Sequence, residues 1–172
     1  GGLGTQAVFP AGSAPYSIVA GNFNADSNID LAVANSGSNN VSVLIGNGSG
    51  GFSAPTNFSA GTSPISIASA DFTNDGKADL AVTNFGGFFF GTVSILIGNG
   101  TGGFAAGTPL RTRTQPSFVT SANLNGDGSP DLVVASFGAN SVSTFFGNNN
   151  GTFVLSQNIT TGAGPVSVKL AD

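Results

Sequence analysis

Residues 70–82, "ADFTNDGKADLAV", place three aspartates within nine residues of a chain that is only 7% charged. All eight acidic residues of the 172-residue chain are Asp, and seven of them lie in this loop or in two similar loops that end at Asp30 and Asp131. The eighth, Asp172, lies where Asp71 opens the loop quoted above. Acidic side chains are therefore concentrated at one recurring position of the chain.

The chain repeats around these loops at intervals of about 50 residues. Each unit opens with a proline and a short apolar segment, at Pro15, Pro64, Pro116 and, for an incomplete unit, Pro165. The acidic loop follows, then an Asp-Leu-Ala-Val type run, then a Val-Ser-x-x-x-Gly run and an element marked by Phe. Short β-branched runs that end in Gly and Asn predict strands. Four strands in a unit of this length are typical of a propeller blade.

The repeat boundaries predict an open, all-β chain of blades made of four antiparallel strands. We place repeat 1 at residues 15–61, repeat 2 at 64–113 and repeat 3 at 116–162. Residues 5–12 align with the last strand of a preceding blade, and residues 165–172 with the first strand of a following one. Propellers usually have four to eight blades, so three blades leave open ends that invite pairing. The chain could belong to a longer propeller chain, close a ring with other chains, or assemble with itself head to tail as a filament.

The acidic loops carry oxygen side chains at alternate positions, the pattern that predicts a calcium site. Ca²⁺ takes six to eight oxygen ligands, and a tight loop can direct alternating side chains to one centre. The backbone carbonyl at the fourth of these positions can serve in place of the side chain, so Lys77 is compatible with such a site. The candidate metal residues are Asn22, Asn24, Asp26, Asn28 and Asp30; Asp71, Thr73, Asp75, Lys77 and Asp79; and Asn123, Asn125, Asp127, Ser129 and Asp131.

Turn formation offers a second explanation for these loops, because Asp, Asn and Gly all favour tight turns. Turn chemistry alone does not require three or more oxygen side chains at alternate positions in every unit, so we favour calcium. Gly76 and Gly128 allow the sharp bend that convergent ligands need, whereas the first loop has Ser27 there. Asn22 and Asn123 in place of Asp lower the ligand charge, so weaker binding is expected there.

With these motifs the chain resembles the FG-GAP/VCBS repeat family, which forms the blades of the integrin α-subunit propeller and of many secreted proteins. Residues 63–84, "SPISIASADFTNDGKADLAVTN", followed by residues 93–109, "VSILIGNGTGGFAAGTP", look like one complete repeat. The resemblance covers almost the whole chain. It implies structural calcium in the hairpin between the first two strands of each blade, and a secreted or cell-surface setting with a role in adhesion or recognition.

Composition argues against several other functions. A net charge of −4 and four basic residues do not fit a nucleic-acid partner, which needs clustered Lys and Arg. No apolar run is long enough to insert into a membrane. The chain has no His, Cys or Glu, so a catalytic acid or base would have to come from the calcium-loop aspartates, and we predict that it is not an enzyme.

Three further features suggest surface contacts. Phe88, Phe89 and Phe90 fall in a three-residue expansion of unit two and form a candidate contact patch, or else they fold over a blade. Arg111 and Arg113 could hold an acidic sugar or a carboxylate of a partner, but we favour the simpler explanation that they belong to a solvated outer strand. Glycosylation sequons occur at Asn40, Asn47, Asn57, Asn99, Asn150 and Asn158, little more often than chance predicts.

Together these observations predict a calcium-binding extracellular protein with a structural or adhesive role. Ca²⁺ would rigidify the hairpin loops, and the blades would assemble end to end with other chains, as in a glycosylated filament. The alternative is a recognition module, a lectin-like or integrin-like propeller fragment that binds carbohydrate or protein.

Overall fold

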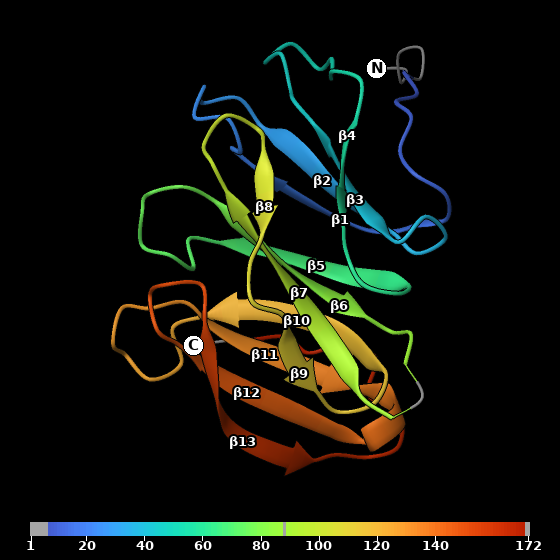
Figure 1. Ribbon diagram of the computed structural model, residues 1–172, viewed down its shortest axis with the longest axis vertical. Helices are drawn as coiled ribbons and strands as arrows, with labels where there is room; N and C mark the ends of the chain where they lie inside the picture. Colours follow the sequence, from blue (N-terminus) through green and yellow to red (C-terminus); the bar gives the residue numbers. More distant parts are fainter. Residues whose placement is uncertain (1–6, 88, 171–172) are drawn as a thin grey trace, which may run out of the picture.

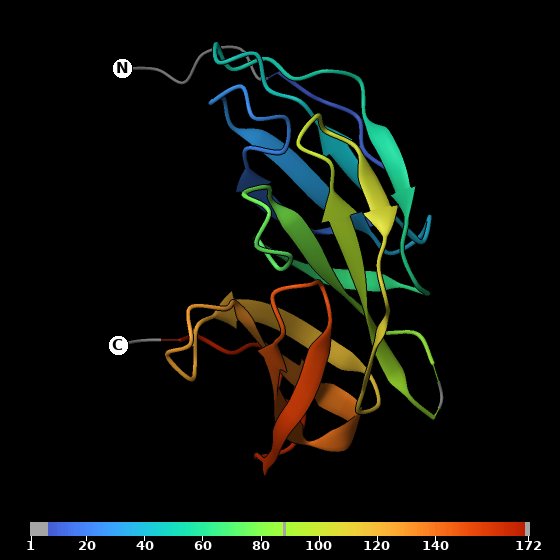
Figure 2. The ribbon, with the colours of Figure 1, turned by 60° about the vertical axis from the view of Figure 1, so that its left-hand side comes forward.

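The computed structural model describes residues 7–87 and 89–170, which form three antiparallel sheets (Figure 1). Figure 2 shows the sheets following one another along the long axis of the molecule, from blue through green to orange. This arrangement confirms the prediction of an open row of propeller-like, four-stranded antiparallel blades. The strands are β1 (Pro15–Gly21), β2 (Asp30–Asn35), β3 (Asn40–Leu44), β4 (Thr56–Ser59), β5 (Pro64–Ala70), β6 (Asp79–Asn84), β7 (Gly91–Gly98), β8 (Phe104–Ala106), β9 (Leu110–Thr112), β10 (Pro116–Ala122), β11 (Asp131–Ser136), β12 (Ser141–Gly147) and β13 (Phe153–Thr160).

The innermost strand of each blade begins at the repeated proline. In each case the register shifts just after it, as between Pro64 and Ser66 of β5. Proline lacks an N–H and is therefore suited to the first residue of a strand. The innermost strands pack side by side, with β5 between β1 and β10. The acidic loops follow the same end of each innermost strand, so all three loops lie on one side of the row of blades (Figure 1).

The outermost strand is broken in two of the three blades. In the second blade it is split into β8 and β9, both paired with β7, with Pro109 between them. In the first blade Phe52 makes only an isolated bridge to Gly46, and β4 begins just after Pro55. A proline cannot donate a hydrogen bond to the neighbouring strand. The third blade has no proline in this segment, so β13 is continuous apart from one register shift.

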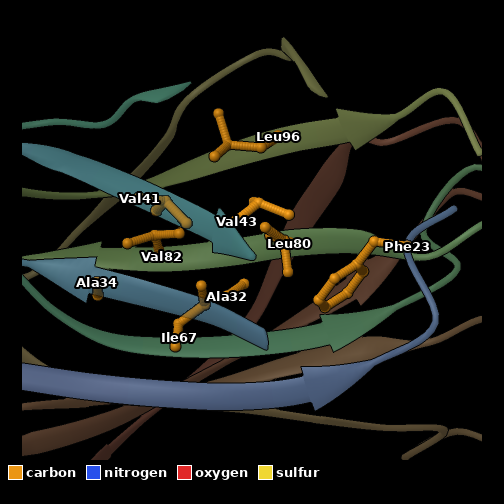
Figure 3. Close-up of a cluster of buried hydrophobic side chains, with 9 residues drawn as sticks. All are labelled: Phe23, Ala32, Ala34, Val41, Val43, Ile67, Leu80, Val82 and Leu96. Atoms are coloured by element: carbon orange, nitrogen blue, oxygen red, sulfur yellow. The ribbon is translucent and has the colours of Figure 1, made fainter. Parts of the chain in front are cut away.

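Two hydrophobic clusters fill the junctions between blades. Figure 3 shows the cluster between the first and second blades, where Phe23 and Val43 of the first blade meet Ile67 and Leu80 of the second. The junction between the second and third blades repeats it, with Phe72 and Ile95 meeting Val119 and Leu132. Each blade therefore has one face for its predecessor and another for its successor.

The two ends of the row expose positions that are buried at the junctions. Ile18 of β1 is 59% exposed, whereas its counterparts Ile67 and Val119 are 7% and 1% exposed. At the other end Leu124 is 40% exposed, whereas its counterparts Phe23 and Phe72 are each 2% exposed. Apolar faces of the kind that join one blade to the next are thus open at both ends.

The flanking segments continue the geometry of the repeat. Phe9 packs edge-on against Phe52 with ring centroids 5.2 Å apart, just as Phe58 packs against Phe104 at 5.4 Å. At the other end the Ser117 hydroxyl donates a hydrogen bond to the Pro165 carbonyl. Residues 7–12 and 165–170 form no strand ladder within the described chain. The remaining parts of the predicted flanking strands, residues 5–6 and 171–172, lie outside the described residues.

Candidate metal centre

Each acidic loop connects the innermost strand of its blade to the second strand, at β1–β2, β5–β6 and β10–β11. The bend that was predicted at Gly76 and Gly128 is present, because both residues have positive φ, 79° and 89°. Ser27 adopts the same conformation in the first loop with a φ of 70°, although a residue with a Cβ is less stable there. The three loops therefore share one backbone path despite their different side chains.

The last aspartate of each loop is fully buried and holds two strand ends together. Its two carboxylate oxygens accept hydrogen bonds from different backbone N–H groups. In the second loop Asp79 accepts them from Phe72 at 2.9 Å and from Gly98 at 2.8 Å. Asp30 and Asp131 make the same pair of contacts in the other two blades. We call Asp30, Asp79 and Asp131 the clamp aspartates.

This clamp was missed in the sequence analysis, which named these residues only as candidate metal ligands. A signal was present in the Gly that lies at the end of the third strand, or two residues after it in the first blade. A Cβ on Gly98 would collide with the carbonyl oxygen of Ala78, just before the clamp aspartate. Gly46 and Gly147 are equally close to Ile29 and Pro130. The repeated glycine therefore lets the third strand approach the loop closely enough to donate its N–H.

The middle aspartate of each loop shapes the turn. Asp26, Asp75 and Asp127 each accept a hydrogen bond from the backbone N–H two residues later, at 2.8, 3.0 and 2.7 Å. These bonds favour the charged carboxylate. The pKa of Asp75 lies below its usual range, chiefly because the Lys77 ammonium donates a hydrogen bond at 3.0 Å. The pKa of Asp26 is also lowered, chiefly by the Asn24 amide.

The second loop differs from the other two in its side-chain contacts. In the first loop the Asn24 amide nitrogen donates to Asp26, and in the third the Asn125 amide nitrogen donates to Asp127, both at 2.8 Å. The second loop has Thr73 instead, whose hydroxyl lies 3.5 Å from an Asp71 oxygen and 3.3 Å from an Asp79 oxygen. Three oxygen side chains thus converge in the second loop, where the Lys77 ammonium replaces the asparagine amide as the side-chain donor to the middle aspartate.

Among the three loops, the second has the side chains that are best suited as ligands of a hard cation. Asp71, Thr73 and Asp79 supply only oxygen, as Ca²⁺ prefers. Burial raises the pKa of Asp79, and hydrogen bonds from Gly98, Phe72 and Thr73 oppose that rise. A bound cation would also favour the charged form of this carboxylate. In the described part of the chain no three His, Cys, Asp or Glu side chains form a group that could hold a metal ion, so any shell must include hydroxyl, amide or backbone oxygens.

The sequons lie mainly on turns and outer strands. Asn47, Asn57, Asn99, Asn150 and Asn158 are exposed, and Asn40 is partly buried. Several of them also organise the turn themselves. The Asn99 side-chain oxygen, for example, accepts hydrogen bonds from the backbone N–H groups of Thr101 and Gly103. Exposure is compatible with glycosylation, which stays a prediction.

The phenylalanine patch projects from the loop between β6 and β7. Phe89 and Phe90 are 83% and 63% exposed, while Phe88 lies outside the described residues. The Arg111 guanidinium carbon lies 5.7 Å from the centroid of the Phe90 ring. The patch is therefore open to a partner and adjoins the two arginines.

Comparison with known proteins gave one family match. The family described as FG-GAP-like repeat matches residues 22–82 and 123–172, which together make up more than half of the chain. No curated protein matched. A solved structure titled "Crystal structure of BBS1N in complex with ARL6DN, soaked with lead" is similar over 91% of this chain, with 15% identity and a TM-score of 0.39. The similar region spans 59% of that chain. Among the described residues no helix has the length and hydropathy needed to cross a membrane.

Proposed function

Because this chain belongs to the FG-GAP-like repeat family, we propose that it is a calcium-binding extracellular repeat protein with a structural or adhesive role. In this proposal its blades assemble end to end with blades of other chains. The observation that carries the proposal is the pair of open apolar faces, at Ile18 on one end and Leu124 on the other.

The two open faces are complementary, because faces of the same two kinds pack together at each junction between blades. The face around Ile18 corresponds to the side of the second blade that packs on the first, and the face around Leu124 corresponds to the side of the first blade that receives the second. A second copy of the chain can therefore dock its first blade on the third blade of its neighbour. Such contact between two different faces is heterologous, and it grows into a filament unless the rotation closes a ring.

Calcium would act by stabilising the loops on which the junctions depend. Phe23 and Phe72 sit inside the acidic loops and are also core residues of the two junctions. A loop that is held by an ion therefore holds its phenylalanine in the junction. Extracellular modules bind Ca²⁺ weakly, with dissociation constants of about 10⁻⁴ to 10⁻³ M, which suits the amide-rich first and third loops.

Calcium is expected to stabilise the folded chain by about 2.7 kcal/mol per site at a hundredfold excess over the dissociation constant. Asp71→Asn should remove much of this effect, because it lowers the ligand charge of the second loop. It should fold normally in EGTA, since Asn22 and Asn123 already occupy the same position in the other loops. Thermal unfolding in calcium and in EGTA measures both effects. Asn123→Asp, the reverse change, should increase the stabilisation of the folded chain by calcium. A wild-type chain that unfolds at the same temperature in calcium and in EGTA would contradict the proposal.

End-to-end assembly is expected to fail when either open face receives a charge. Ile18→Asp and Leu124→Asp should each sediment as monomers, because each variant has lost one of the two faces. A mixture of the two should form dimers, since each variant supplies the face that the other lacks. Ala105→Asp is the matched control, as Ala105 is exposed on β8 of the middle blade. Assembly that survives both face variants, or a mixture that stays monomeric, would refute head-to-tail contact.

A recognition function is the second candidate, and one observation favours it. A cavity lined by two arginines and two exposed phenylalanines lies at the junction of the second and third blades, away from the open faces.

A further inference from the structure

A cavity of about 580 Å³ lies on the outer side of the junction between the second and third blades. Arg111 of strand β9 and Arg113, just after it, supply one wall, and strands β12 and β13 supply the other with Ser143 and Asn158. Phe89 and Phe90 line it from the loop between β6 and β7, which ends at Gly91, the partner of Thr112 in β9. The volume is in the range of small-molecule sites.

The repeat supplies an internal control for this cavity. The corresponding cavity between the first and second blades has about 310 Å³. By strand register, Ser59 and Gly61 stand there where the second blade has Arg111 and Arg113. That cavity has no charged or aromatic residue among its lining residues. Blade packing therefore requires neither the arginines nor the phenylalanines, because these groups line the cavity at only one of the two junctions.

The charge at this cavity is unusual for the chain. Arg111 and Arg113 are half of its basic residues, and no acidic residue lines the cavity. Within residues 7–87 and 89–170 the only salt bridge joins Lys77 to Asp75, so neither guanidinium has a carboxylate partner there. Arg111 lines the cavity from β9, and Arg113 lines it from just beyond the end of this strand. Both arginines can therefore approach one anionic ligand.

The remaining lining groups suit a sugar ring. The Ser143 hydroxyl donates to the Asn158 side-chain oxygen at 2.6 Å, which leaves the Asn158 amide nitrogen without a partner among the described residues. Thr112 and Thr114 add hydroxyl groups. The phenylalanine faces carry negative charge density and favour the C–H groups of a ring. Arginine binds carboxylates with two parallel hydrogen bonds.

We propose that this cavity binds a saccharide that carries a carboxylate, such as a uronic acid unit. The arginines take the carboxylate, the hydroxyl and amide groups take the sugar hydroxyls, and Phe89 and Phe90 pack on the ring. The inference specifies the recognition function, and it depends neither on the calcium loops nor on end-to-end assembly. An acidic peptide is a poorer fit, because an extended peptide needs a continuous groove, whereas this cavity is lined on one side by Phe89 and Phe90 of the loop between β6 and β7.

The test is calorimetric titration of the full chain with trigalacturonic acid and with its methyl ester, in EGTA so that calcium cannot bridge protein and sugar. The acid should bind with one site per chain, and the ester, which lacks the charge, should bind more weakly by a factor of about ten or more. Arg111→Gln should weaken the binding of trigalacturonic acid by a similar factor. Lys169→Gln removes one positive charge outside the cavity and should leave binding unchanged.

Equal binding of acid and ester, no binding of either, or full binding by Arg111→Gln overturns the proposal. Saturable binding of an Asp-rich peptide that trigalacturonic acid does not displace would also overturn it, in favour of a peptide site. Failure here is distinguishable from failure of the assembly proposal, because Ile18→Asp and Leu124→Asp leave the cavity intact and can be titrated in parallel.

Discussion

Asp79→Asn is expected to lower the free energy of unfolding by about 2 to 4 kcal/mol even without calcium. The Asp79 carboxylate is fully buried and accepts hydrogen bonds from the backbone N–H groups of Phe72 and Gly98. An amide has the same shape but only one oxygen, so its NH₂ group must face one of these donors. A buried donor without an acceptor costs the desolvation energy of that group.

Urea denaturation in EGTA measures this loss, and the absence of calcium separates the clamp from any metal site. Asp75→Asn is the matched control, because it makes the same chemical change in the same loop at an exposed carboxylate. Its stability should be nearly unchanged. Asp30→Asn and Asp131→Asn should behave like Asp79→Asn, because their contacts are the same. Similar losses for Asp75→Asn and Asp79→Asn would contradict the clamp.

Phe72→Ala is expected to cost about 3 to 5 kcal/mol, the usual range for a buried phenylalanine. Phe72 lies in the cluster between the second and third blades and packs edge-on against Phe153, with ring centroids 5.4 Å apart. Leu124→Ala removes the side chain at the corresponding position of the third blade, where it is 40% exposed. In a monomeric chain this variant should lose far less stability, because little contact is removed.

The pair of variants also connects stability with assembly. Denaturation at low protein concentration, where the chain is monomeric, should give a large loss for Phe72→Ala and a small one for Leu124→Ala. Under assembling conditions Leu124→Ala should instead weaken association, because Leu124 would then be covered by the next blade. If Phe72→Ala and Leu124→Ala lowered the stability of the monomer equally, Leu124 would already be covered within the third blade. The basis for an open face there would then be lost.

Much of the fold was predictable because each blade is a local unit. The prolines at 15, 64 and 116 begin the innermost strands, and Gly76 and Gly128 have the positive φ that their loop positions suggested. These features depend on residues close together in the chain, where proline and glycine act on the backbone directly. Repetition then multiplied the signal, since the same pattern recurs in three units.

The tertiary structure alone decided the features that join distant residues. The clamp brings Gly98 to Asp79 and Gly147 to Asp131, and the cavity brings Arg111 to Asn158 across two blades. The exposure of Ile18 and Leu124 likewise depends on which blade lies next to each residue. The sequence by itself therefore determined the repeat, the blade type and the oxygen-rich loops, through local backbone preferences. Buried hydrogen-bond partners, open faces and the cationic cavity depend on packing between segments that the sequence separates by many residues.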